Sequence, residues 1–213
     1  MQLHSPGSSR PTSGSISSRE IYSRLSGPAP VLTAYGPAAG AERLDLSGKV
    51  LANHCAKAAN LLGDDLLWEG DIELDLPAHW RVFTWGLGAL LAGLQPVFGP
   101  ADCVISADPD READELIRTS LGALDLSWPG DLGGAVDGNA EALAQADDLI
   151  VTGALDVQLT PAAPGRYYLV DPAPADLFAA SLAIVAGGAS LVVVDAGHEE
   201  AARTTEGARR WDM

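Results

Sequence analysis

The chain has 213 residues, of which 47% are hydrophobic and 20% are charged, a composition typical of one large globular domain or two small ones. Its 29 acidic and 13 basic residues give a formal net charge of −16. Such a charge repels phosphate backbones and anionic lipid headgroups, so the composition argues against nucleic acid and membrane surfaces as partners.

The N-terminal segment differs in composition from the rest of the chain. Residues 1–27 are rich in Ser, Gly and Pro and lack the apolar run of a signal peptide. This predicts a disordered tail, followed by a single α/β domain over residues 28–213. Two isolated cysteines, Cys55 and Cys103, form no redox or zinc motif, so we expect small hydrophobic residues in a reducing, cytoplasmic compartment.

Strands and helices alternate in the first half of the predicted domain. The predicted strands cover residues 31–35, 43–46, 71–76 and 101–106. The predicted helices cover residues 47–67, with Ser47 as cap, and residues 78–94, and a third begins at Pro109 with an acidic first turn. Gly86 and Gly88 are expected to permit close packing of the second helix.

The second half continues the same alternation after a loop over residues 125–138. It predicts strands at 149–151, 166–171 and 189–195, and helices at 139–147, at 174–186 and at the polar C-terminal end. This order predicts an α/β fold with a mainly parallel sheet flanked by helices. The apolar stretches 82–98 and 177–194 contain Gln95-Pro96 and Gly187-Gly188, which favours buried elements over membrane spans.

The common phosphate-binding and nucleophile motifs are missing. Gly48-Lys49 has Arg43 where a P-loop requires a glycine, and Gly86-Leu87-Gly88 has Leu91 where the dinucleotide fingerprint requires one. No Gly-x-Ser-x-Gly elbow occurs. The sequence therefore identifies no catalytic residue and no cofactor-binding residue.

The carboxylates and histidines also give no metal-ligand pattern. Asp71, Glu73 and Asp75 share one strand face and are expected to form a solvated or edge-protecting row. The acidic residues 108–115 are expected to form a solvated helix face. His54 adjoins Cys55 on a helix, where neighbouring positions do not face each other, and no two histidines have ligand spacing. We therefore expect no metal site, and we expect Trp80 and Trp85 to lie in the core.

Two regions resemble adenylate-forming (AMP-binding) enzymes such as acyl-CoA synthetases. Leu32-Thr33-Ala34-Tyr35, Leu74-Asp75-Leu76-Pro77 and Leu91-Ala92-Gly93 stand where the start of those enzymes has a Leu-Thr-Tyr strand, a strand that ends in Pro and a helix that ends in Ala-Gly. Residues 176–194 resemble their later helix and Val-rich strand. The chain is also similar to a short actinobacterial family of unknown function that resembles a trimmed N-terminal piece of these enzymes.

The resemblance also implies parts that this sequence lacks. The enzymes bind the ATP triphosphate with a Ser/Thr/Gly-rich loop that contains a lysine, and this loop should fall within residues 150–165. That segment has Thr152-Gly153 but no lysine and no glycine run. Both lysines of the chain, Lys49 and Lys57, precede it, and neither the catalytic lysine of the mobile C-terminal domain nor the adenine-binding segment has a counterpart. We therefore expect ATP-dependent adenylation to be lost.

Two function classes follow from these observations. The first is a catalytically inactive relative of the adenylate-forming N-terminal domain, which acts as a binding or interaction module for a protein partner, a second copy, or an acyl or adenosine ligand. The second is an enzyme of another class, with Asp75, His79, Asp108 and Asp171 near predicted strand ends as candidates. A partial adenylating domain that needs a partner is a further alternative.

Overall fold

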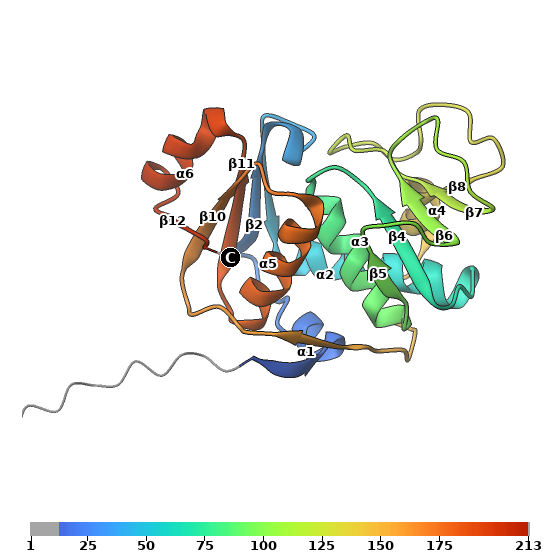
Figure 1. Cartoon of the computed structure of the whole chain (residues 1–213), viewed down its shortest axis with the longest axis horizontal. Coiled ribbons are helices and arrows are strands. Elements are labelled where there is room, and N and C mark those ends of the chain that lie inside the picture. Colours follow the sequence, from blue (N-terminus) through green and yellow to red (C-terminus); the bar gives the residue numbers. More distant parts are fainter. Residues whose placement is uncertain (1–12, 213) are drawn as a thin grey trace, which may run out of the picture.

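The strands form two five-stranded sheets and one two-stranded ribbon, which are described in a computed structural model of residues 13–212 (Figure 1). Sheet 1 has the order β12 (Arg209–Arg210), β10 (Arg166–Val170), β11 (Ser190–Val194), β2 (Pro30–Tyr35) and β3 (Arg43–Ser47). Sheet 2 has the order β5 (Gln95–Val97), β4 (Asp71–Asp75), β6 (Cys103–Ser106), β7 (Glu115–Arg118) and β8 (Val136–Asp137). The ribbon pairs β1 (Gly14–Ser17) with β9 (Asp156–Leu159).

Three helices form the layer between the two sheets in Figure 1: α2 (Gly48–Asn60), α3 (Trp80–Ala92) and α5 (Pro174–Ala186). A π-helical turn (Leu61–Asp65) continues α2. The shorter helices are α1 (Ser18–Ser23), η1 (Gly36–Ala38), α4 (Gly138–Ala144), η3 (Ala196–His198) and α6 (Glu199–Thr204). All pairs in sheet 2 and all but the β2–β3 pair in sheet 1 are parallel, which confirms the predicted α/β class.

The N-terminal segment is folded from β1 onward. β1 pairs antiparallel with β9, and Ile21 of α1 is fully buried. Ile16 and Leu25 join the same hydrophobic core, so the segment has enough apolar surface to dock. The prediction of a disordered tail through residue 27 is therefore wrong for residues 14–25, whereas residues 1–12 lie outside the described residues.

The helix predicted at Pro109 is a turn followed by a strand. Arg111 N donates to Asp108 O (3.3 Å), and Asp110 N donates to the Asp108 side chain (2.9 Å), so Pro109 is the second residue of a β-turn. The next apolar pair, Leu116 and Ile117, is buried in β7 of sheet 2. Proline at this position suits a turn as well as a helix start, and burial in the sheet decides between them.

A second predicted element is also wrong. Residues 149–151 form no strand; they belong to a loop in which Ile150 N donates to Asn60 Oδ1 of α2 (2.9 Å). Asn60 is fully buried and also donates to the carbonyls of Ala146 and Asp148. One buried amide thus satisfies the backbone of this segment in place of a neighbouring strand.

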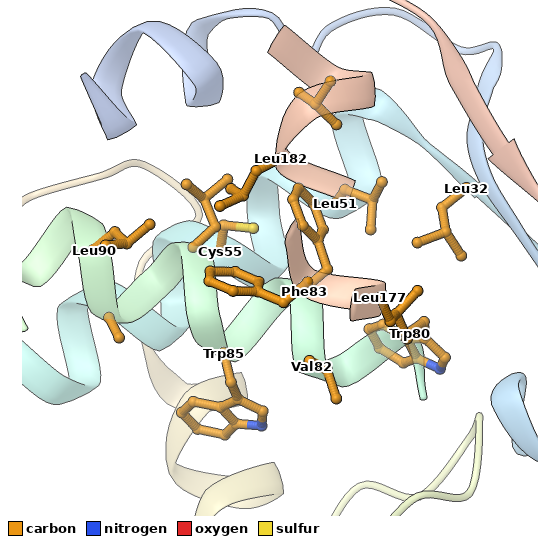
Figure 2. Packing of buried hydrophobic residues seen from close by; sticks show 14 of the residues in the cluster. Leu32, Leu51, Cys55, Trp80, Val82, Phe83, Trp85, Leu90, Leu177 and Leu182 are labelled. Carbon is orange, nitrogen blue, oxygen red and sulfur yellow. The ribbon is translucent and has the colours of Figure 1, made fainter. Parts of the chain in front are cut away.

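The helical layer forms one continuous hydrophobic core with both sheets. Figure 2 shows Phe83 of α3 beside Cys55 and Leu51 of α2, with Leu177 and Leu182 of α5 close by. Trp80 and Trp85 are buried as predicted, and both cysteines are buried and unpaired. The core therefore fixes where α3 begins, and with it the position of the polar residues at that end.

The predicted role of the α3 glycines is confirmed by their surroundings. A Cβ atom on Gly88 would lie 2.7 Å from the Cβ of Ala58, and one on Gly86 would overlap the Phe178 ring. The two positions therefore allow α3 to approach α2 and α5 closely.

Replacing Gly88 with valine is expected to lower the free energy of unfolding by about 1–3 kcal/mol, because the added atoms force α2 and α3 apart. Urea unfolding of Gly88→Val and of the control Gly99→Val measures the difference, since a Cβ on Gly99 meets nothing within 4 Å. Equal stability of the two variants would contradict the close packing.

Candidate functional site

A pocket of about 160 Å³ lies where α2, α3, α4 and the loop after β7 meet. The loop after β7 and the first turns of α3 and α4 follow strands of sheet 2, so the pocket lies at the carboxyl ends of those strands, where ligands of open α/β sheets bind. Its walls are mostly apolar, with several polar groups among them. The lining residues are His54, Lys57, Ala58, Arg81, Thr84, Trp85, Ala123, Leu124, Asp125, Leu126, Gly138, Asn139, Ala142 and Leu143.

The start of α3 brings two polar side chains, His79 and Arg81, into the protein interior on either side of Trp80. His79 caps the helix, with its ring Nδ1 accepting from Arg81 N (3.2 Å). The Arg81 guanidinium lies over the Trp80 ring, 4.6 Å from its centroid, and His54 of α2 meets the same ring edge-on at 5.1 Å. His79 is fully buried, and Trp80 and Arg81 are 2% and 8% exposed.

Burial sets the charges in this cluster. It lowers the pKa of His54 to about 4, with help from the charges of Arg81 and Lys57. Burial and Arg81 lower the pKa of His79 to about 3, although nearby carbonyls of Leu121 and Ala39 favour its protonated form. Burial lowers the pKa of Arg81 to about 10 against the opposing effect of Asp125. Near pH 7 both imidazoles are therefore neutral and Arg81 is charged.

The other charged residues at the pocket already have partners. Lys57 Nζ lies 3.0 Å from Asp147 Oδ1 and donates to the carbonyls of Leu143 and Gln145. Asp125 accepts from the Ser120 hydroxyl. Arg81 differs from both, because no side-chain hydrogen bond or ion pair links it to another described residue, and its buried Nε has no acceptor.

Arg81 was not among the residues predicted from the sequence. One signal was present: Arg81 is the single charged residue of α3, a helix in which every residue but the last is buried. A charge in such a helix has to point at a partner or at a cavity. Helical periodicity alone does not reveal which, because no solvent-facing side exists to compare.

The candidate residues of the alternative enzyme do not all meet. Asp75 and Asp108 come together through Ser106, whose hydroxyl donates to Asp75 Oδ2 (2.8 Å) and accepts from Asp108 N (2.9 Å). His79 contacts neither of them through a hydrogen bond in the described part of the chain. Asp171 follows β10 in sheet 1, where it accepts from Ala196 N (3.1 Å).

The prediction of solvated carboxylates on β4 is wrong for the central residue of the three, Glu73. Glu73 is only 8% exposed, and its Oε2 lies 2.5 Å from Nη2 of Arg111. The turn at Pro109 carries Arg111 back over the sheet, which strand alternation alone does not reveal. Within residues 13–212, no three His, Cys, Asp or Glu side chains are grouped as a metal site would require.

The segment 150–165 is fixed against the helical layer. A Cβ atom on Gly153 would lie 2.6 Å from the Ala92 backbone, and Leu155 N donates to Leu90 O (3.0 Å). Farther along, β9 pairs with β1, and Ala162 N donates to Ala183 O of α5 (2.8 Å). Among the described helices, none combines the length and apolar character that crossing a bilayer requires.

Comparisons with known proteins support the fold described above. No protein-family model matches the chain. A Mycobacterium tuberculosis (strain ATCC 25618 / H37Rv) protein named TIGR03089 family protein is 36% identical over 96 residues, which are 43% of this chain and 39% of that protein. The chain therefore matches well under half of this relative.

Solved structures match over most of the chain. An acyl-CoA synthetase of Brucella canis has a TM-score of 0.66 at 15% identity, over 91% of this chain and 46% of its own. Coronafacic acid ligase from Pectobacterium brasiliense has a TM-score of 0.61 at 12% identity, over 88% of this chain and 47% of its own. The N-terminal subdomain of NpsA from Klebsiella oxytoca has a TM-score of 0.57 at 13% identity, over 89% of this chain and 59% of its own.

These identities support a common fold and no more, and the chain spans about half the length of the two enzymes. The resemblance found in the sequence is confirmed at that level. The chain has the fold of the N-terminal region of acyl-CoA synthetases and related adenylate-forming enzymes.

Proposed function

We propose that this chain is a ligand-binding module that keeps the fold of the adenylate-forming enzymes and does not activate substrates with ATP. The observation that carries the proposal is the structure of residues 150–165. The family resemblance implies a phosphate-binding loop here, with glycines, hydroxyls and a lysine. This chain has Thr152-Gly153 and no lysine in that segment.

The backbone of the segment supports the same conclusion. A phosphate-binding loop presents free backbone N–H groups to the oxygens of its ligand. Here the N–H groups of Ile150, Leu155 and Ala162 donate to protein oxygens, and β9 is paired in the ribbon. Several donors on either side of Thr152-Gly153 therefore hold the segment on α2, α3 and α5.

The charge distribution also argues against phosphoryl chemistry. Lys49 and Lys57 both lie on α2, and Lys57 is bound to Asp147 and to two carbonyls. Transition states of phosphoryl and acyl transfer rely on fixed cations and donors, each worth about 3–4 kcal/mol. A chain of net charge −16 that lacks several of them would lose most of the rate enhancement.

Calorimetric titration of the chain with MgATP, AMP and an acyl-CoA tests the proposal. We expect no saturable heat with MgATP up to millimolar concentrations. Binding of AMP or acyl-CoA without preference for the triphosphate would agree with a binding module. Micromolar affinity for MgATP would contradict the proposal, since residues 150–165 have neither the lysine nor the glycine run of a triphosphate-binding loop.

A further inference from the structure

Arg81 is a largely buried cation that lies over the Trp80 ring and has no hydrogen-bond or ion-pair partner among the described side chains. Its residue is 8% exposed, its Nε is buried without an acceptor, and no carboxylate of the described residues lies within 4 Å of its guanidinium nitrogens. Stacking on Trp80 leaves the N–H groups of the guanidinium without acceptors, whereas buried charges in folded proteins are normally paired and hydrogen-bonded. The charge is retained near pH 7, because the pKa of Arg81 stays at about 10.

A second buried arginine in the same half of the molecule shows how a structural guanidinium is accommodated. Arg118 is 7% exposed and donates to three carbonyls, those of Leu132 (3.3 Å), Asp108 (2.8 Å) and Arg111 (3.0 Å). Its donors hold two loops together. Arg81 has comparable burial and none of these contacts, and it lines a pocket instead.

The pocket beside Arg81 has room for a small molecule. Its volume of about 160 Å³ is close to that of a protein cavity of about 150 Å³ that binds benzene. Trp85 and Ala142 supply apolar wall, and Leu124 and Leu126 line the pocket while they are 91% and 70% exposed. Two leucines so exposed beside an apolar cavity are placed to cover the body of a ligand.

The other polar groups restrict the charge of that ligand. His54 is neutral near pH 7, and the Lys57 charge is offset by Asp147. Asp125 contributes one negative charge to the pocket wall and is held by Ser120. A single negative charge therefore matches Arg81, whereas a doubly charged phosphate monoester would be repelled by Asp125.

We propose that this pocket binds a small organic molecule that has one singly charged oxyanion, held by the Arg81 guanidinium, and a compact apolar body, covered by Leu124 and Leu126. The guanidinium fork suits two parallel hydrogen bonds to such an oxyanion. This inference rests on the proposed function, because it names the ligand class of the binding module.

Titration with benzenesulfonate and benzoate tests the site, with the neutral benzamide and the dianionic phenyl phosphate as comparisons. Both monoanions are expected to bind saturably and to raise the unfolding temperature, and the two comparison molecules at least about tenfold more weakly. The ratio of the two monoanion affinities shows whether the site prefers a sulfonate or a carboxylate. If neither monoanion binds saturably, the proposal is overturned, whatever the nucleotide titration shows.

Arg81→Met is expected to weaken binding of the preferred monoanion at least about tenfold, and Arg81→Lys by less. The control Arg203→Met removes the same charge from an exposed position on α6 and should leave binding unchanged. Unliganded Arg81→Met should be at least as stable as the parent chain, because it removes an unpaired buried charge. Unchanged affinity in Arg81→Met, or a marked loss of its stability, would overturn the proposal.

A second variant does not disturb the interior. Leu124→Glu places a negative charge at the exposed rim and should weaken monoanion binding about threefold or more, whereas Ile150→Glu, at a position 55% exposed outside the pocket, should not. Equal affinities of these two variants would contradict the placement of the ligand under Leu124.

Discussion

Lowering the pH from 6.5 to 4.5 is expected to reduce the free energy of unfolding by roughly 4 kcal/mol through His54 and His79 alone. In the folded chain their pKa values are about 4 and about 3, below the 6.5 of a free imidazole. The unfolded chain therefore takes up protons in this range and the folded chain does not. Stability is complete above pH 6.5 and is lost as the pH falls toward the folded pKa values.

Urea unfolding at pH 7.0, 6.0, 5.0 and 4.5 measures this effect. The matched variant is His54→Gln together with His79→Asn, since asparagine can still cap α3 while neither new side chain titrates. Its stability should be nearly flat over this range. Hydrogen bonds with Tyr35, Arg166 and Arg43 lower the pKa of Glu206 to about 2. Its contribution to the free energy of unfolding is therefore lost only below about pH 4.5. An equally steep pH dependence in the variant would contradict the neutral, buried histidines.

Replacing Ile21 with alanine is expected to lower the free energy of unfolding by about 2–5 kcal/mol, because the side chain is fully buried in the core. Ile21 lies on α1, which packs on the helical layer. The Ser18 hydroxyl of the same helix donates to Leu90 O of α3 (3.3 Å). A segment that is merely a tail would give no change.

Val50→Ala is the control for this substitution, since Val50 is 40% exposed on α2 and its truncation should change stability by about 0.5 kcal/mol or less. Urea unfolding of both variants and of the parent chain gives the comparison. If Ile21→Ala were as stable as Val50→Ala, the N-terminal segment would not be docked as described.

Local patterning predicted most of the elements that form the core. The strands at 31–35, 71–76, 166–171 and 189–195 and the helices at 78–94 and 174–186 are confirmed within a few residues. These segments have apolar side chains at strand or helix spacing, and the structure buries the faces that the spacing predicts. The α/β class follows from their order.

Where the prediction was wrong, distant contacts decide the local structure. Nothing in the order of the elements reveals that the strands divide into two sheets with α2, α3 and α5 between them. β1 and β9 pair only with each other, and their register partners Ser17 and Asp156 are 139 positions apart in the chain. The β-turn at Pro109 depends on hydrogen bonds to Asp108 and on burial of the next strand.

The candidate site was less accessible to prediction than the fold. The residues at strand ends that the sequence suggested lie in different places, with Asp75 and Asp108 at sheet 2 and Asp171 at sheet 1. Arg81 was not recognised, because a site defined by a missing partner becomes visible only when every neighbour is placed. By contrast, the missing lysine in residues 150–165 was evident from the sequence, and the structure adds that the N–H groups of Ile150, Leu155 and Ala162 donate within the protein.

The most direct measurement for the account as a whole is exchange of radiolabelled pyrophosphate into ATP, with Mg²⁺ and a panel of short, branched and aromatic carboxylic acids. Only formation of an acyl-adenylate releases pyrophosphate and allows its return. We expect incorporation at the level of samples without protein for every acid, including those that bind beside Arg81. Incorporation above that level that depends on the acid would contradict it.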